Sequence, residues 1–134
     1  RKPIQTHYIR WDNTETERHH LVSFKADGCN FDSYSIRYAT ELLKQRREKH
    51  KLMNIISDGL PSAYFSGSEG IRQNTLAIED ARKEKIQVFG TAIGKQNNKD
   101  FTKMYGKDFY MNVQDFELLA GQTAEMIKKI VQDW

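Results

Sequence analysis

LMNIISDG, residues 52–59, is the stretch that decides the fold. A short apolar run that is flanked by charge and ends in Asp-Gly is typical of a strand buried on both faces of a parallel sheet. Residues 86–93 (IQVFGTAI) have the same character and end at Gly94. The two runs therefore predict two buried strands, each followed by a turn.

Helices are predicted on both sides of these strands, because apolar residues recur there at spacings of three and four. The first helix begins at Asp32 or Ser33, either of which can cap it, and extends to about residue 50. Later patterns predict a helix over 71–85, a short helix over 101–105, a strand over 109–113 and a last helix capped by Asp115. The apolar stripe of this last helix, from Phe116 to Trp134, is interpreted as core packing.

Helices and strands alternate from residue 33 onward, and this predicts an α/β fold with a doubly wound, mostly parallel sheet and helices on both faces. Before that point, residues 5–11 (QTHYIRW) and the apolar patch at 21–24 have the composition of strands. No linker or repeat divides the sequence, so residues 1–134 are interpreted as one domain.

The composition excludes several classes of protein. Hydrophobic residues make up 38% and charged residues 29%, which excludes a disordered or low-complexity chain. The net charge of +3 is too small to demand a nucleic-acid partner, and no apolar run approaches the roughly 18 residues of a membrane span. The single Cys29 excludes an internal disulfide and favours a reducing compartment, which we expect to be the cytoplasm.

Oxygen-bearing side chains follow the predicted strands. Ligands of open α/β sheets bind beyond the carboxyl ends of the strands, and Asp58 lies there, directly after a buried strand. The loop before the first helix, with Asn30 and Asp32, is expected to open at the same edge, and Ser57 and Thr91 lie nearby in the pattern. These oxygen ligands suit Mg²⁺. The alternative is that Asp58 is only a turn or N-cap residue.

Several segments in this order resemble the von Willebrand factor A (vWA) domain. They are residues 30–39 (NFDSYSIRYA), 53–61 (MNIISDGLP), 77–82 (AIEDAR) and 86–94 (IQVFGTAIG). The resemblance covers about residues 27–133 and is to a bacterial branch with the vWA subunit of cobaltochelatase and the nitric oxide reductase activation protein. The pattern Ser-Asp-Gly-x-Pro-Ser-Ala-Tyr is typical of that branch, and residues 57–64 fit it. A Rossmann-like vWA fold is implied.

The resemblance also implies a metal-ion-dependent adhesion site (MIDAS). There, Mg²⁺ is held by an Asp-x-Ser-x-Ser loop after the first strand, a Thr in the next loop and an Asp after the fourth strand. Asp58 matches the last of these, and the Thr position falls on Asn30 or Asp32. No Asp-x-Ser-x-Ser occurs in the sequence, so we expect a truncated domain that lacks the first central strand. The metal site would then be partial, and Mg²⁺ weakly bound or absent.

An open sheet edge is a further consequence of the missing strand, and it predicts either rearranged strand pairing or a homodimer formed by strand exchange. The resemblance implies a non-catalytic interaction module that works with an AAA+ ATPase on a client metalloenzyme, in cobalamin biosynthesis or nitric oxide reductase activation. A partner carboxylate would then complete the coordination of the metal. Tyr64 and Phe65, after Asp58, would either grip the partner or cover the sheet.

Two other functions remain as alternatives. One is a Mg²⁺-dependent hydrolase or phosphotransferase with Asp58 as metal ligand or nucleophile. The other is a structural remnant that binds no metal. The sequence contains no nucleophile elbow, phosphate-binding loop or dinucleotide fingerprint, and this favours a protein that is not an enzyme.

Overall fold

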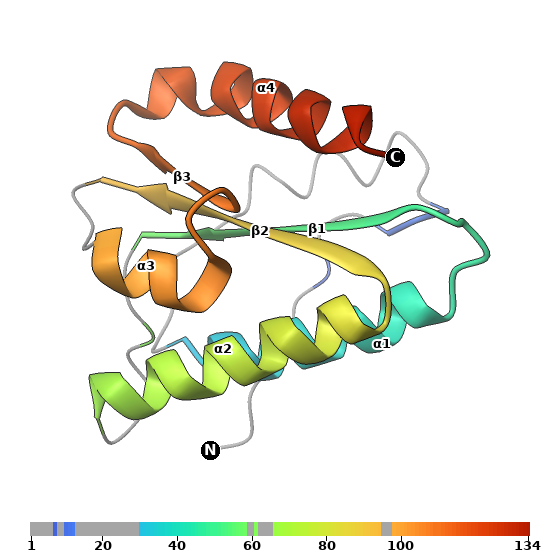
Figure 1. Ribbon diagram of the computed structural model, residues 1–134, viewed down its shortest axis with the longest axis horizontal. Coiled ribbons are helices and arrows are strands. Elements are labelled where there is room, and N and C mark those ends of the chain that lie inside the picture. Colours follow the sequence, from blue (N-terminus) through green and yellow to red (C-terminus); the bar gives the residue numbers. More distant parts are fainter. Residues whose placement is uncertain (1–6, 8–9, 13–29, 59–60, 62–65, 95–97) are drawn as a thin grey trace.

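The computed structural model describes residues 7, 10–12, 30–58, 61, 66–94 and 98–134. Its elements, in chain order, are α1 (Asp32–Lys44), β1 (Lys51–Ser57), α2 (Gly67–Lys83), β2 (Ile86–Ile93), α3 (Asn98–Tyr105), β3 (Tyr110–Val113), the 3₁₀ helix η2 (Phe116–Leu118) and α4 (Leu119–Gln132). The strands form one parallel sheet in the order β1-β2-β3. Helices lie on both faces of it (Figure 1), which confirms the predicted α/β class.

The strand predicted over 86–93 is confirmed as β2, whereas several helix ends differ from the prediction. The helix α2 ends at Lys83 and not at residue 85, and α3 begins at Asn98 and not at residue 101. The helix α1 stops at Lys44 and not near residue 50, because its last turn closes with a tighter bond of 3.1 Å from the Arg46 N–H to the Leu43 carbonyl, three residues back. The helix α2 starts four residues earlier than expected, because Ser66 caps it by accepting a hydrogen bond from the Glu69 backbone N–H.

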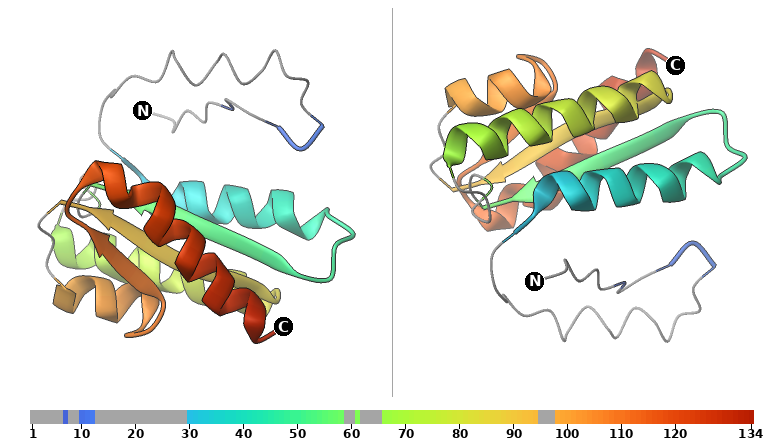
Figure 2. Two further views of the ribbon diagram at one scale, coloured as in Figure 1. Left: turned by 90° about the horizontal axis from the view of Figure 1, so that it is seen from above. Right: turned by 90° about the horizontal axis from the view of Figure 1, so that it is seen from below.

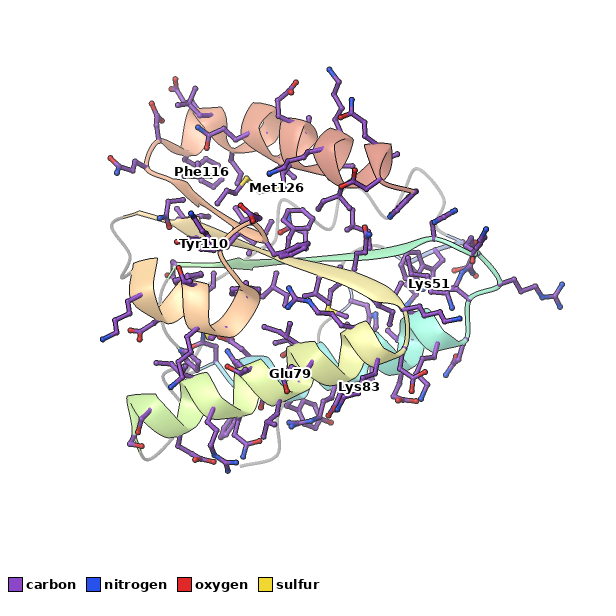
Figure 3. All side chains as sticks on the ribbon, viewed as in Figure 1. Lys51, Glu79, Lys83, Tyr110, Phe116 and Met126 are labelled. Atoms are coloured by element: carbon purple, nitrogen blue, oxygen red, sulfur yellow. The ribbon has the colours of Figure 1, made fainter. Side chains whose placement is uncertain are left out.

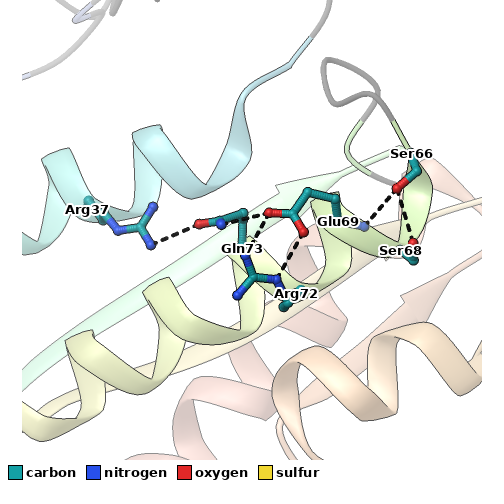
Figure 4. A network of polar contacts seen from close by, with 6 residues as sticks. All are labelled: Arg37, Ser66, Ser68, Glu69, Arg72 and Gln73. Carbon is teal, nitrogen blue, oxygen red and sulfur yellow. Dashed lines mark hydrogen bonds and ion pairs between the residues drawn. The ribbon is translucent and has the colours of Figure 1, made fainter.

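A hydrogen-bonded network follows this cap along α2 and reaches α1 (Figure 4). The Glu69 carboxylate accepts from Arg72 and from Gln73, one turn further on. Gln73 in turn accepts a bond of 3.4 Å from the Arg37 guanidinium, which lies on α1. Most of this network lies at the surface, so we expect it to contribute little to stability.

Of the strand predicted over 5–11, only three residues belong to the described part of the chain, and none of them is in a strand. His7 forms a hydrogen bond of 2.9 Å with the Tyr38 hydroxyl on α1, and Trp11 lies in a turn beneath the Arg46 guanidinium. The strand prediction is wrong at these residues, because His7 contacts α1 and Trp11 lies in a turn. The patch at 21–24 lies outside the described residues.

The main core lies between the sheet and the layer formed by α1, α2 and α3, which is seen from below in Figure 2. Alanines at 77 and 81 are fully buried and let α2 approach β2 closely. The buried members of this core are Ile36, Leu43, Met53, Ile71, Ala77, Ile78, Ala81, Ile86, Val88, Ala92, Phe101, Met104 and Tyr105.

The helix α4 lies across the opposite face of the sheet, where Figure 3 labels Phe116 and Met126. It follows η2, whose N-cap is Asp115, as predicted, with Oδ1 accepting from the Glu117 N–H at 3.1 Å. Within the stripe that was predicted to be core, only Ile130 is buried, while Phe116 is 69% exposed. The prediction that the whole stripe packs in the core is therefore wrong.

The width of the sheet explains this difference. Phe89 and Val113 are fully buried on the α4 face, and the Trp134 indole donates to Gln87 there at 2.6 Å. Ile56, on the same face of β1, is 54% exposed. The three described strands form a sheet that is too narrow for α4 to bury its whole apolar stripe against it. Among the described strands, β1 pairs with β2 alone, so no other described strand lies along its outer edge.

None of the described helices combines the length with the hydropathy that crossing a bilayer requires.

Candidate functional site

Two carboxylates lie where β1 ends and α1 begins. Asp58 follows the last residue of β1 and is exposed, while Asp32 is the first residue of α1 and half-buried. The first turn of α1 and the carboxyl ends of β1 and β2 lie at the same edge of the sheet (Figure 1). The alternation of strand and helix in the sequence produces this arrangement, because each helix runs back along the sheet against the direction of its strand.

Both oxygens of the Asp32 carboxylate accept hydrogen bonds from side-chain amides. Asn30 Nδ2 donates to Oδ1 at 2.9 Å, and Asn74 Nδ2, from α2, donates to Oδ2 at 3.5 Å. Both donors are neutral. Within the described part of the chain, no Lys, Arg or His side chain forms an ion pair with Asp32. The carboxylate is thus held in place without being neutralised.

The surroundings of Asp32 act against its negative charge. Burial raises the pKa of the Asp32 carboxyl group above its ordinary value, and the nearby charge of Asp58 raises that pKa further. The hydrogen bonds from Asn30 and Asn74 lower it, but by less than burial raises it. A cation bound beside Asp32 and Asp58 would offset both the burial of the Asp32 charge and its repulsion by Asp58. The electrostatics of the site therefore favour a positive ligand.

Asn74 belongs to this site, although the sequence analysis did not identify it. It is 1% exposed, and its Oδ1 has no hydrogen-bond partner within the ranges that the structure describes. A buried polar atom without a partner costs about 1–3 kcal/mol, so its presence requires an explanation. The signal in the sequence is an amide side chain within the buried face of α2, between Ile71 and Ala77.

Other predicted residues lie elsewhere or outside the described structure. Thr91 is fully buried, and its hydroxyl donates to Asn54 Oδ1 at 2.8 Å inside the sheet, so it is not brought to the two carboxylates. Tyr64 and Phe65 lie outside the described residues. No group of three His, Cys, Asp or Glu side chains suited to a metal occurs in the ranges that the structure describes. The set at this edge is therefore two acids with amides.

Comparison with known proteins gives two partial similarities. The chain is 32% identical over 116 residues to "Uncharacterized protein YojO" of Bacillus subtilis (strain 168), and 26% identical over 83 residues to "Protein NorD" of Stutzerimonas stutzeri. These matches cover 83% and 60% of the chain. The chain spans only 18% and 14% of the two relatives, less than a fifth of either. No protein-family model matches the sequence.

The raised pKa of Asp32 predicts how stability depends on pH. The folded chain holds the Asp32 proton more tightly than the unfolded chain, in which the pKa is close to 3.8. The stabilising contribution of this group is therefore complete below that pH and is lost as the pH rises through the raised folded value. At neutral pH the charge of Asp32 destabilises the fold.

We accordingly expect Asp32→Asn to unfold at a higher temperature than the unaltered chain at neutral pH, with the gap closing towards about pH 4. Thermal unfolding in a chelating buffer across this range measures the effect. Asp80→Asn, an exposed change on α2, is the control and should show no such trend. A lower unfolding temperature for Asp32→Asn at neutral pH would contradict the prediction.

Proposed function

We propose that the chain is a protein–protein interaction module of the vWA type with a partial Mg²⁺-dependent adhesion site. The observation that carries this proposal is the Asp32 carboxylate, oriented by two amides, close to Asp58 and without a cationic partner among the described residues. Burial and the nearby Asp58 disfavour the ionised form of Asp32, as the raised pKa of its carboxyl group indicates. Binding a divalent cation would give the arrangement a use.

The donor set fits Mg²⁺ in kind. Carboxylate oxygens of Asp32 and Asp58 and an amide oxygen of Asn30 are the hard ligands that this ion prefers. They are too few to fill an octahedron, and Mg²⁺ commonly keeps several waters. We therefore propose weak binding by the isolated chain, with Asp58 and Asp32 as direct ligands and Asn30 either as a ligand or as a support for Asp32.

The role of the site would be to recognise a carboxylate on a partner protein. When bound, the ion supplies the positive charge to which such a group attaches. Asp58 and Asp32 keep that charge at the sheet edge, and the amide of Asn30 holds one oxygen of Asp32 in place. Because Asp58 is exposed, a partner has direct access to this edge.

The vWA resemblance and the similarity to Protein NorD support a role in activating nitric oxide reductase. On this proposal the partners are an AAA+ ATPase and a client metalloenzyme in the cytoplasm. The chain matches less than a fifth of each relative. These partners are therefore proposed on the basis of proteins of the relatives' full length.

Calorimetric titration with Mg²⁺ and Mn²⁺ tests the metal site. The unaltered chain should bind both ions, and Asp58→Ala should weaken binding at least about tenfold because a direct charged ligand is lost. Asp80→Ala removes a carboxylate that is exposed on α2 and paired with Lys83, so it matches the charge change and should leave the affinity unchanged. Absence of binding in both titrations would contradict the proposal and favour a structural remnant.

The same variants separate this function from a hydrolase or phosphotransferase. An interaction module has no turnover of a generic phosphate ester with either metal. Metal-dependent turnover that disappears in Asp58→Ala would replace the proposed function with the enzymatic one.

A further inference from the structure

Asn74 occupies a position where an apolar residue is expected. It lies on the face of α2 that packs in the main core, with Ile71 before it and Ile78 after it at helical spacing. Burying an amide at such a position loses its hydration, and the loss is recovered only through hydrogen bonds. Asn74 recovers little in this way, so packing alone does not account for it.

The contacts of Asn74 lead to a single strong acceptor. Its Nδ2 donates to Asp32 Oδ2 at 3.5 Å and lies 3.8 Å from the Met104 sulfur on α3, which is a weak acceptor. Among the described residues, its Oδ1 has no hydrogen-bond partner. The amide therefore joins three helices, and within the described chain the carboxylate of Asp32 is the charged group that it contacts.

Asp32 needs such a contact because the start of α1 does not hold its side chain. The N-cap position is Phe31, whose side chain makes no capping bond. Asn30 holds Oδ1 from the residues just before the helix, and Asn74 holds Oδ2 from 42 residues further along the chain. Among the described residues, the titratable groups that act on Asp32 from the other packed elements are Asp58 after β1 and the buried phenol of Tyr105 on α3, and neither is a cation.

We propose that Asn74 is a positioning residue of the ion site, one that orients the Asp32 carboxylate towards the edge shared with Asp58. This inference rests on the proposed function, since it assigns a role within the same site. An amide that places its N–H donor inside the core also buries its oxygen, and this accounts for the unpartnered Oδ1. Residues that orient metal ligands in this way affect affinity although they do not touch the metal.

The proposal predicts opposite effects on binding and on stability. Asn74→Leu has nearly the same size, removes the donor to Asp32 and removes the unpartnered Oδ1. We expect it to weaken Mn²⁺ binding about tenfold. In a chelating buffer it should unfold at the same or a higher temperature than the unaltered chain. A residue with a purely structural role would show the reverse, a lower unfolding temperature with unchanged affinity.

A double-mutant cycle shows whether Asn74 acts through Asp32. Asn74→Leu is compared in the unaltered chain and in Asp32→Asn, with Mn²⁺ affinity by calorimetry and unfolding in a chelating buffer as readouts. We expect the tenfold loss to vanish in the Asp32→Asn background. Thr75→Val, on the same helix with its hydroxyl bonded to Ile71 O, is the control and should leave affinity unchanged.

The two readouts keep the inference separate from the function on which it rests. If the unaltered chain binds neither Mn²⁺ nor Mg²⁺, the proposed function fails. The double-mutant cycle in chelating buffer then still tests whether Asn74 and Asp32 interact. Non-additive changes in unfolding for Asn74→Leu and Asp32→Asn would support the interaction, and additive changes would overturn it. Where Mn²⁺ does bind, equal losses for Asn74→Leu in both backgrounds would overturn the inference.

Discussion

Replacing Gly90 with valine is expected to lower the free energy of unfolding by about 3 kcal/mol, the upper end for overpacking a core. A Cβ at this position would lie 2.7 Å from Cε2 and Cζ of Tyr105 and 2.9 Å from its Cδ2. The Tyr105 ring is 2% exposed and stacks on Phe101, with 5.8 Å between ring centroids. Gly90 pairs with Ile55 and Tyr110 on either side, so neither the ring nor the strand has room to move away.

Urea unfolding of the variant measures this loss. Gly121→Ala is the control, because a Cβ there meets no atom within 4 Å and alanine is the better helix former. We expect it to raise the stability by up to about 1 kcal/mol. Combining Gly90→Ala with Tyr105→Leu should recover part of what Gly90→Ala loses alone. Unchanged stability of Gly90→Val would show that the contact with Tyr105 is not as tight as described.

Arg82→Met is expected to lower the free energy of unfolding by about 2–3 kcal/mol. Arg82 Nη2 donates to the carbonyl oxygens of Val88, at 3.0 Å, and Tyr105, at 2.6 Å. The guanidinium also lies 5.0 Å from the centroid of the Phe109 ring. One cation thereby joins α2, the start of β2 and the end of α3. Methionine fills a similar volume but leaves both carbonyl groups without this donor.

Thermal and urea unfolding of Arg82→Met would be compared with Lys83→Met. Lys83 is exposed, and its ion pair is with Asp80 on the same helix, so its replacement should change stability by less than about 0.5 kcal/mol. Arg82→Lys should fall between the two, because lysine keeps a charged donor but carries it on a flexible stem as a more strongly hydrated ammonium group. A loss for Arg82→Met no larger than that for Lys83→Met would contradict the argument.

The predictable parts of the fold are those governed by local pattern. The run at 86–93 became β2 without a shift, and Asp115 caps η2 as its side chain suggested. The start of α2 was missed because Gly67 and Gly70 indicate a loop, while the capping bond of Ser66 outweighs them. The stripe on α4 failed for a different reason. Periodicity identifies an apolar face but not how wide a sheet that face will meet.

In the candidate site, too, the features set by local sequence pattern could be predicted and those set by tertiary contacts could not. The carboxyl end of a buried strand is visible in the sequence, and so are Asp58, Asp32 and Asn30. The contribution of Asn74 is not visible in the sequence, because it arises from a contact with a residue 42 positions away. Within α2, the spacing of Asn74 is that of an ordinary core residue. Arg82 was missed likewise, since a cation that binds two backbone carbonyls leaves no pattern in the side chains.

The outer edge of β1 has a practical consequence for anyone handling the chain by itself. No described strand pairs with the backbone groups of this edge, Ile56 beside it is exposed, and neither a proline nor a charged residue interrupts residues 52–56. A concentrated sample would be prone to stack molecule on molecule along that side, so dilute handling, or a lysine in place of Ile56, is the sensible starting point for solution work.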